Sequence, residues 1–337
     1  MENGRQLKQS TSNSVQAFWV AAGSFSSFGL AIISAAILSR YLNKAEYGTY
    51  RQIIYIYSTL LVIFAAGLPG VFSYYLPRFN RSQGKVIVLK ISRMLLLFGL
   101  LFSITLYLLS NVIAEILKNP ELAQGLKYFS PIPLLLLPTM GIEGIFSSYK
   151  KSEYIAIYNT ATRLMMLLFI VLPVILFRGT YLYAIYGWLA ASVVILLFTI
   201  YFRQIPFKQV TSEHADLPYK KIFSYSLPIL ISSLAGIAIR SADQFYISRF
   251  FGAVTFAEFS NGFVELPFVG MVTAAVSTTL FPEFSRLFHE QMGFSRIVEL
   301  WRSALLKSAM IIYPLVVFFI INSNFIIEIL YTSAYLN

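Results

Sequence analysis

Five ionisable residues stand inside otherwise apolar stretches of this 337-residue chain: Glu143, Arg163, Arg240, Asp243 and Glu265. An ionised side chain at mid-bilayer costs at least ~2.5 kcal/mol unless it is compensated, so such residues are usually kept for a function. A guanidinium group matches the oxygens of a phosphate, and a carboxylate can hold a cation or a proton. The two arginines are therefore candidates for binding an anion, and the three acids for binding an ion.

Position separates these candidates. Arg163 lies 10 residues after Glu153 and 15 before Arg178, which places it near the centre of a span. The alternative role for Arg163 is a structural pair with a carboxylate of a neighbouring helix. Arg240 and Asp243 are three residues apart and share one helix face, so they could simply neutralise each other. Arg240 could also extend to the membrane surface, as Glu143 could through its nearness to the basic residues that follow it.

The elements that position these residues are membrane-spanning helices. Only 12% of residues are charged, against about a quarter in soluble proteins, and the mean hydropathy is +0.69. Charge-free runs such as 9–39 and 52–77 exceed the ~20 residues that a spanning helix needs. We predict nine spans: Val15–Leu38, Ile53–Leu76, Met94–Ala114, Phe129–Tyr149, Ile155–Phe177, Tyr181–Phe202, Ile222–Ile247, Phe259–Phe281 and Ser308–Ile327.

Several functions are excluded or disfavoured by composition. The chain has no cysteine and only two histidines, which excludes disulfides and thiolate metal sites and argues against a metal-centred enzyme. No G-x-x-x-x-G-K-[ST] run is present, so the chain has no P-loop for ATP hydrolysis. We therefore expect no catalytic residues, no metal and no nucleic acid, and we attribute the net charge of +11 to basic loops that contact lipid headgroups.

The basic residues also predict the orientation. With a cytoplasmic N-terminus, seventeen of the 26 Lys and Arg residues fall in inside segments and seven in outside segments. Cytoplasmic loops are enriched in Lys and Arg, so this orientation is favoured. The first outside loop, with Arg40, Lys44 and Arg51, runs against the rule.

The chain also contains an internal repeat. Ser39-Arg40-Tyr41 after the first span matches Ser248-Arg249-Phe250 after the seventh, at an offset of 209. Leu76-Pro77 matches Phe281-Pro282 at an offset of 205. Glu115-Ile116-Leu117 matches Glu328-Ile329-Leu330 at an offset of 213. Six spans separate the copies, so both copies have the same orientation, with a site expected between two lobes.

From this repeat we predict an all-α fold of parallel duplicated six-helix lobes. Residues 1–202 form the N-terminal lobe with six spans, 203–221 a cytoplasmic linker, and 222–337 a C-terminal lobe with three spans. The repeat predicts three further spans after Asn337, so we expect this chain to hold an incomplete second lobe.

Two stretches carry a family resemblance. Ser39-Arg40-Tyr41-Leu42 with Glu46-Tyr47-Gly48-Thr49-Tyr50, and the run from Ser241 to Gly252 (SADQFYISRFFG), resemble the polysaccharide transporters of the multidrug/oligosaccharidyl-lipid/polysaccharide exporter superfamily. The resemblance extends over nearly the whole chain from Val15, although its members carry twelve or more spans.

This resemblance implies a flippase rather than an enzyme. Its members move polyprenyl-pyrophosphate-linked oligosaccharides, such as precursors of O-antigen in lipopolysaccharide or of capsule, across the inner membrane by alternating access. Arg163 and Arg240 would then bind the pyrophosphate or sugar, and Asp243, Glu265 and Glu143 would couple transport to Na⁺ or H⁺. The implied partners are the lipid-linked oligosaccharide, membrane lipids and the polysaccharide polymerase machinery, and no cofactor is implied beyond the coupling ion.

Two alternatives remain. One keeps the fold and exports small drugs with a coupled cation. The other is a membrane-embedded glycan polymerase or ligase, which is disfavoured because the longest predicted outside loop is only about 14 residues.

Two further patterns concern the helices themselves. Gly67, Pro69 and Gly70 in the second span, and Gly262, Pro267 and Gly270 in the eighth, could serve as hinges. The tyrosine-rich stretches, Tyr47 to Tyr57 and Tyr181 to Tyr186, indicate aromatic belts at the membrane interface.

Overall fold

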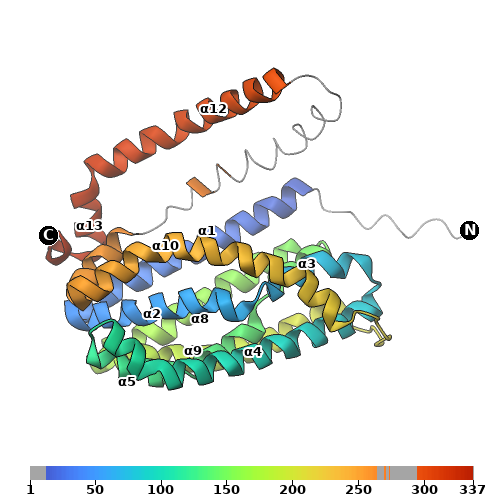
Figure 1. Cartoon of the computed structure of the whole chain (residues 1–337), viewed down its shortest axis with the longest axis horizontal. Helices are drawn as coiled ribbons and strands as arrows, with labels where there is room; N and C mark the ends of the chain where they lie inside the picture. The colour runs from blue at the N-terminus through green and yellow to red at the C-terminus, as the bar shows by residue number, and fades with distance from the viewer. Residues whose placement is uncertain (1–12, 264–268, 271–272, 274–293, 337) are drawn as a thin grey trace, which may run out of the picture. The chain divides into compact units, whose positions relative to one another are not determined.

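The computed structural model of the chain describes residues 13–263, 269–270, 273 and 294–336. Every regular element of these ranges is a helix (Figure 1). The helices are α1 (Asn13–Tyr41), α2 (Lys44–Ala65), α3 (Leu68–Tyr75), η1 (Leu76–Arg78), α4 (Arg81–Ile116), α5 (Pro120–Phe129), α6 (Ile132–Leu136), η2 (Leu137–Thr139), α7 (Ile142–Ser148), α8 (Ser152–Phe177), α9 (Tyr181–Arg203), η3 (Ile205–Phe207), α10 (Tyr219–Gly262), α12 (Phe294–Ile321), α13 (Ser323–Tyr331) and η4 (Ser333–Tyr335).

The chain is an all-α integral membrane protein. Within the described residues, seven helical segments are long and apolar enough to cross a membrane, and the bent pair α2–α3 makes up to eight. These eight correspond to eight of the nine predicted spans. The predicted span Phe259–Phe281 lies mostly outside the described residues.

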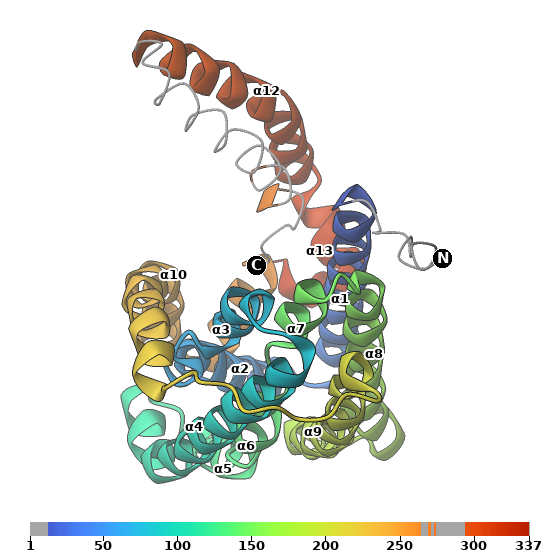
Figure 2. The ribbon, with the colours of Figure 1, turned by 90° about the vertical axis from the view of Figure 1, so that its right-hand side faces the viewer.

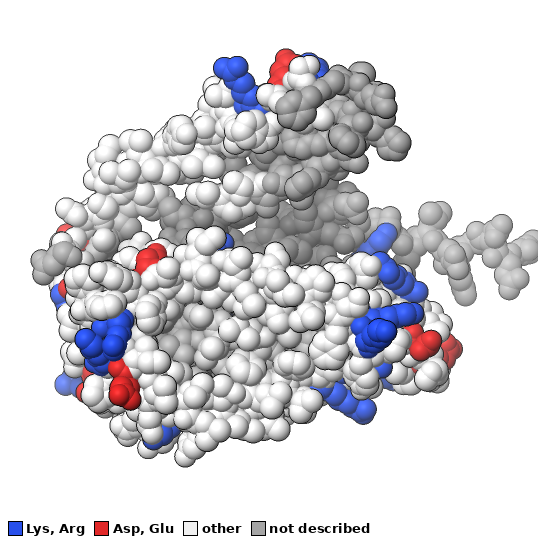
Figure 3. Space-filling model, in the orientation of Figure 1, with Lys and Arg blue, Asp and Glu red and all other residues white. Residues whose placement is uncertain are grey.

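The outer surface agrees with a lipid environment. Large apolar side chains of α4 are exposed, among them Leu97, Ile104 and Leu108. In the bundle formed by residues 1–260, charged side chains gather toward the two ends of the helices and leave an uncharged band between them (Figure 3). A contiguous apolar surface of this extent is typical of membrane contact.

Helix packing divides the chain into two compact units, residues 1–260 and 261–337. The first unit contains α1 to α9 and nearly all of α10. In it, α1 packs along α8, α8 along α9, and α4 against α5 and α6, as the view along the helices shows (Figure 2). The second unit contains α12, which packs against α13. The predicted division into lobes at residues 202 and 222 stays a prediction.

Besides the kink of α10 at Gly252 (φ 81°), two further spans are broken inside the first unit. Between α2 and α3 the chain bends by 46°, with Ala66 and Gly67 both in the left-handed region (φ 50° and 67°). The segment from α5 to α7 is interrupted by η2 and by Gly141 at φ 87°. Glycine adopts this conformation without a Cβ penalty. The hinge predicted at Gly67 is thus a bend in the structure, and the second break was not predicted.

The linker between α9 and α10 lies across one end of this bundle. Lys85 and Lys90 of α4 donate hydrogen bonds to the carbonyls of Val210 (3.0 Å) and Leu217 (2.6 Å). Phe207, Leu217 and Ile222 are buried in a cluster with residues of α3 and α4. The linker is therefore bound to α4 along its length.

The interpretation of the first tyrosine stretch as an interfacial belt was wrong for three residues. Tyr47, Tyr50 and Tyr57 are 0%, 5% and 8% exposed, and Tyr57 packs against Phe102, Phe129 and Trp188. Tyr50 also packs against Trp188, so Tyr50 and Tyr57 belong to an aromatic core between α2, α4, α5 and α9.

Candidate functional site

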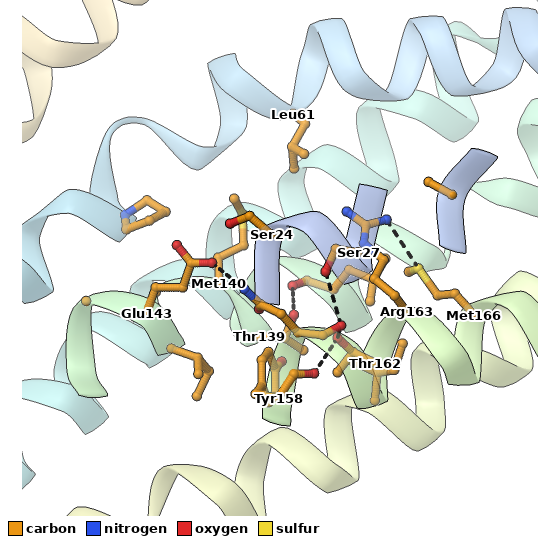
Figure 4. A pocket seen from close by; sticks show the side chains of 18 of the residues that line it. Ser24, Ser27, Leu61, Thr139, Met140, Glu143, Tyr158, Thr162, Arg163 and Met166 are labelled. Carbon is orange, nitrogen blue, oxygen red and sulfur yellow. Dashed lines mark hydrogen bonds between the residues drawn. The ribbon is translucent and has the colours of Figure 1, made fainter. Parts of the chain in front are cut away.

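A cavity of about 860 Å³ lies inside the unit of residues 1–260 (Figure 4). Polar and charged side chains from α1, α3, α7 and α8 line it together with tyrosine and tryptophan from α2 and α9. Both breaks in the spans border it, through Pro69 and Ser73 on one side and through Thr139 to Gly144 on the other. This cavity is the best-developed candidate site among the described residues, because ligand sites are concave with a few convergent polar groups.

One face of α8 supplies most of the polar lining. Tyr158, Asn159, Thr162, Arg163 and Met166 recur at spacings of three and four residues, which places them on one side of a helix. Tyr158 and Thr199 of α9 are joined through their hydroxyls at 2.7 Å, which fixes the ring beside the cavity. Beside this face, α8 packs along α1, with Gly23 of α1 lying directly against Ala156.

Arg163 lies in this cavity with its side chain exposed to the open space. Its Nη1 makes a long contact to the Met166 sulfur, at 4.0 Å. Among the described residues no carboxylate forms an ion pair with Arg163. The alternative role, a structural ion pair with a neighbouring helix, is therefore not observed among these residues. A guanidinium so placed keeps donors for a ligand.

Glu143 lines the same cavity from the first turn of α7. Its Oε1 accepts a hydrogen bond of 2.7 Å from Nδ2 of Asn159. Figure 4 shows Glu143 and Arg163 in different parts of the cavity, with Ser24, Ser27 and Thr139 between them. The cavity thus offers one cationic and one anionic side chain, separated by hydroxyl groups.

A second cavity, of about 180 Å³, adjoins the first at Arg163. Arg163, Met166 and Trp188 line both, and the smaller cavity also receives Arg51, Tyr47 and Tyr50 of α2. Two guanidinium groups from different helices therefore border one small space.

Arg240 and Asp243 lie on α10 and line neither cavity. Asp243 accepts a hydrogen bond of 2.7 Å from the backbone N–H of Gln244, and the carbonyl of Arg240 accepts one from the Gln244 side chain. The structure therefore does not bring these two residues together with Arg163 and Glu143. The fifth candidate, Glu265, lies outside the described residues.

Sequence reasoning missed the uncharged part of the lining. Ser24, Ser27, Asn159 and Thr162 are polar residues at helical spacing within apolar spans, and this periodicity was the available signal. It also missed Arg203, which was assigned to the cytoplasmic linker. Arg203 donates to Oγ of Ser92 at 2.6 Å and to the carbonyl of Pro138, and so joins α4, α9 and η2.

Comparison with known proteins decides the family. The model of the polysaccharide biosynthesis protein family matches residues 15–288, more than three quarters of the chain. The chain belongs to this family. A family of polysaccharide biosynthesis agrees with a multi-pass membrane protein whose internal cavity is lined by hydroxyls, an amide and an arginine.

A distant relative shares the membrane character. The chain is 22% identical over 344 aligned residues to an uncharacterized membrane protein of Methanocaldococcus jannaschii, covering 95% of this chain and 67% of that protein. No solved structure matches the chain. The function is therefore inferred from the family and from the residues that line the cavity.

Proposed function

We propose that this member of the polysaccharide biosynthesis protein family is a flippase for a polyprenyl-pyrophosphate-linked oligosaccharide in the inner (plasma) membrane, with its N-terminus in the cytoplasm. The observation that carries the proposal is Arg163, a cation exposed to a cavity of about 860 Å³ and without an ion pair among the described residues. Arginine binds phosphate oxygens through parallel hydrogen bonds, which suits a pyrophosphate headgroup. The hydroxyl and amide side chains around Arg163 can form hydrogen bonds with the hydroxyl groups of a sugar.

In this mechanism the headgroup enters the cavity while the prenyl chain stays in the lipid. Glu143, held by Asn159, is the described carboxylate that lines the cavity, and it holds the coupling H⁺ or Na⁺. Arg240 and Asp243 stay candidates for substrate and ion contacts outside this cavity, and Glu265 stays a candidate for ion coupling. O-antigen and capsule precursors are the cargo class, and the polymerase machinery is the partner that receives them.

The test uses a strain whose surface polysaccharide depends on a known flippase. After deletion of that flippase, the gene of this protein is supplied, and surface glycan and cytoplasmic lipid-linked repeat units are measured together. Restored glycan with cleared precursor is the expected result. Well-expressed protein that leaves glycan absent but confers drug resistance would instead support the alternative, a cation-coupled drug exporter that uses the Glu143 carboxylate.

Variants then test the site. Arg163→Ala should abolish transport without loss of expression, and Arg163→Lys should restore only part of it, because an ammonium cannot form the paired hydrogen bonds. Arg178→Ala is the matched control, since Arg178 ends the same helix and lines neither cavity. Full activity of Arg163→Lys would refute paired binding.

A further inference from the structure

Polar contacts join α2 to the C-terminal part of α10, at the end of α10 that is remote from the linker. Lys44 Nζ lies 2.6 Å from Glu258 Oε1, and Gln52 Nε2 donates to Ser248 Oγ at 2.8 Å. Arg51 donates twice to Ser260, from Nε to the hydroxyl at 3.0 Å and from Nη2 to the carbonyl at 2.8 Å. We call these three residue pairs the α2–α10 latch.

The latch is built from the two copies of the repeated motif. Ser248 opens the second copy of the motif, with Glu258 and Ser260 shortly after it, and Lys44, Arg51 and Gln52 follow the first copy. Gly48 allows this approach, because a Cβ there would lie 1.9 Å from the carbonyl oxygen of Ala253. The two copies therefore meet directly at the latch.

Arg51 belongs to the latch and to the binding cavities at once. It lines the 180 Å³ cavity that Arg163 lines from α8, while its Nε and Nη2 are committed to Ser260. The Ser260 acceptors are a neutral hydroxyl and a carbonyl. A phosphate oxygen carries charge, and hydrogen bonds to charged acceptors are roughly twice as strong, so an anion in this cavity competes well for Arg51.

We propose that a phosphate group held at Arg163 draws Arg51 away from Ser260 and thereby releases the α2–α10 latch. Substrate binding then opens this end of the bundle, and an empty cavity keeps it closed. The inference rests on the proposed phosphate contact of Arg163 and adds the coupling of that contact to a conformational change.

The absence of cysteine makes the test direct, since introduced thiols are the only labelling sites. Ala45→Cys and Val254→Cys place spin labels on exposed positions of α2 and α10 beside the latch. The distance between them is measured by double electron–electron resonance in phosphatidylcholine nanodiscs, with and without inorganic pyrophosphate. We expect pyrophosphate to populate a longer distance, and Arg51→Gln to show that distance without it. Arg178→Gln, a control of equal charge change, should respond like the parent.

Binding is measured separately by calorimetry on the same samples, with Arg163→Gln as the reference. If pyrophosphate does not bind, the proposed phosphate contact fails and the coupling fails with it. If it binds through Arg163 and the 45–254 distance stays unchanged, only the coupling is refuted. If the 45–254 distance lengthens in phosphatidylglycerol nanodiscs without pyrophosphate, lipid headgroups release the latch. That result would overturn the proposal as stated.

A charge exchange tests the latch without any ligand. Lys44→Glu should populate the longer distance by repulsion from Glu258, and Lys44→Glu with Glu258→Lys should restore the short one. A double variant that elutes as a folded monodisperse protein and keeps the long distance would show that the ion pair does not hold the helices together.

Discussion

Glu143 and Asn159 give the cavity a carboxylate whose position is fixed by one hydrogen bond. Glu143→Gln keeps an oxygen that accepts from Asn159 but removes the charge. If Glu143 holds the coupling ion, transport should lose its dependence on the ion gradient while the protein stays folded. Measurements of transport in proteoliposomes, with and without an H⁺ or Na⁺ gradient, check this. An unchanged gradient dependence would exclude Glu143 as the coupling residue.

We expect substitution of Arg203 to change the stability of the fold rather than the binding of a ligand. Arg203→Met removes hydrogen bonds to Ser92 and to the Pro138 carbonyl and leaves buried acceptors unpaired. The loss should be about 2–4 kcal/mol in the free energy of unfolding, measured as a lower thermal midpoint in detergent.

The control for Arg203 is Arg296→Met on α12. Arg296 forms an exposed ion pair with Glu299, with side chains 63% and 69% exposed. Such pairs contribute at most about 1 kcal/mol. Equal destabilisation by both substitutions would contradict the role given to Arg203.

The sequence predicted single charged residues of the site but not their grouping. Arg163 and Glu143 were recognisable because charge is costly in an apolar span. Their common cavity depends on how α7 packs beside α8, and this packing leaves no periodic signal. Arg51 escaped notice because it was placed in a loop outside the membrane.

Among the elements, the break at Gly141 should be sensitive to a single substitution. A Cβ at this position would lie 2.3 Å from the ring of Phe72, which is fully buried, and φ is 87°. Gly141→Ala should therefore destabilise the protein by about 2–4 kcal/mol, through both the clash and the strained backbone. Thermal unfolding in detergent measures this.

Two companion variants define the cause. Gly29→Ala should be close to neutral, since a Cβ there meets nothing within 4 Å. Phe72→Leu should recover part of the loss in the Gly141→Ala background, because contacting residues are not additive. Strict additivity of the two substitutions would rule out the clash with the ring.

Helix positions were predicted better than helix ends. The second span was placed from Ile53, yet α2 begins at Lys44, because the Asn43 side chain accepts from the N–H of Glu46. The third was placed from Met94, yet α4 begins at Arg81 with a capping box between Asn80 and Gln83. Hydropathy locates the apolar part of a helix, whereas caps decide where it begins.

For the whole molecule, the proposed orientation can be checked with single cysteines. Lys118→Cys lies in the turn after α4, and Ser212→Cys lies in the linker; both positions are exposed. With the N-terminus in the cytoplasm, a membrane-impermeant maleimide should label position 118 in intact cells and position 212 only after permeabilisation. The reverse pattern would invert the topology.

The hydrogen bonds between α4 and the linker also determine the point about which α10 can tilt. Lys90 holds the carbonyl of Leu217, two residues before α10 begins, so this end acts as a pivot. From Tyr219 to Ser248 the helix is a lever of roughly 45 Å, at about 1.5 Å per residue. A tilt of about 5° then carries its far end through about 4 Å, beyond the reach of any hydrogen bond. A small rotation at the anchored end is therefore enough to separate Ser248 from Gln52 at the other end.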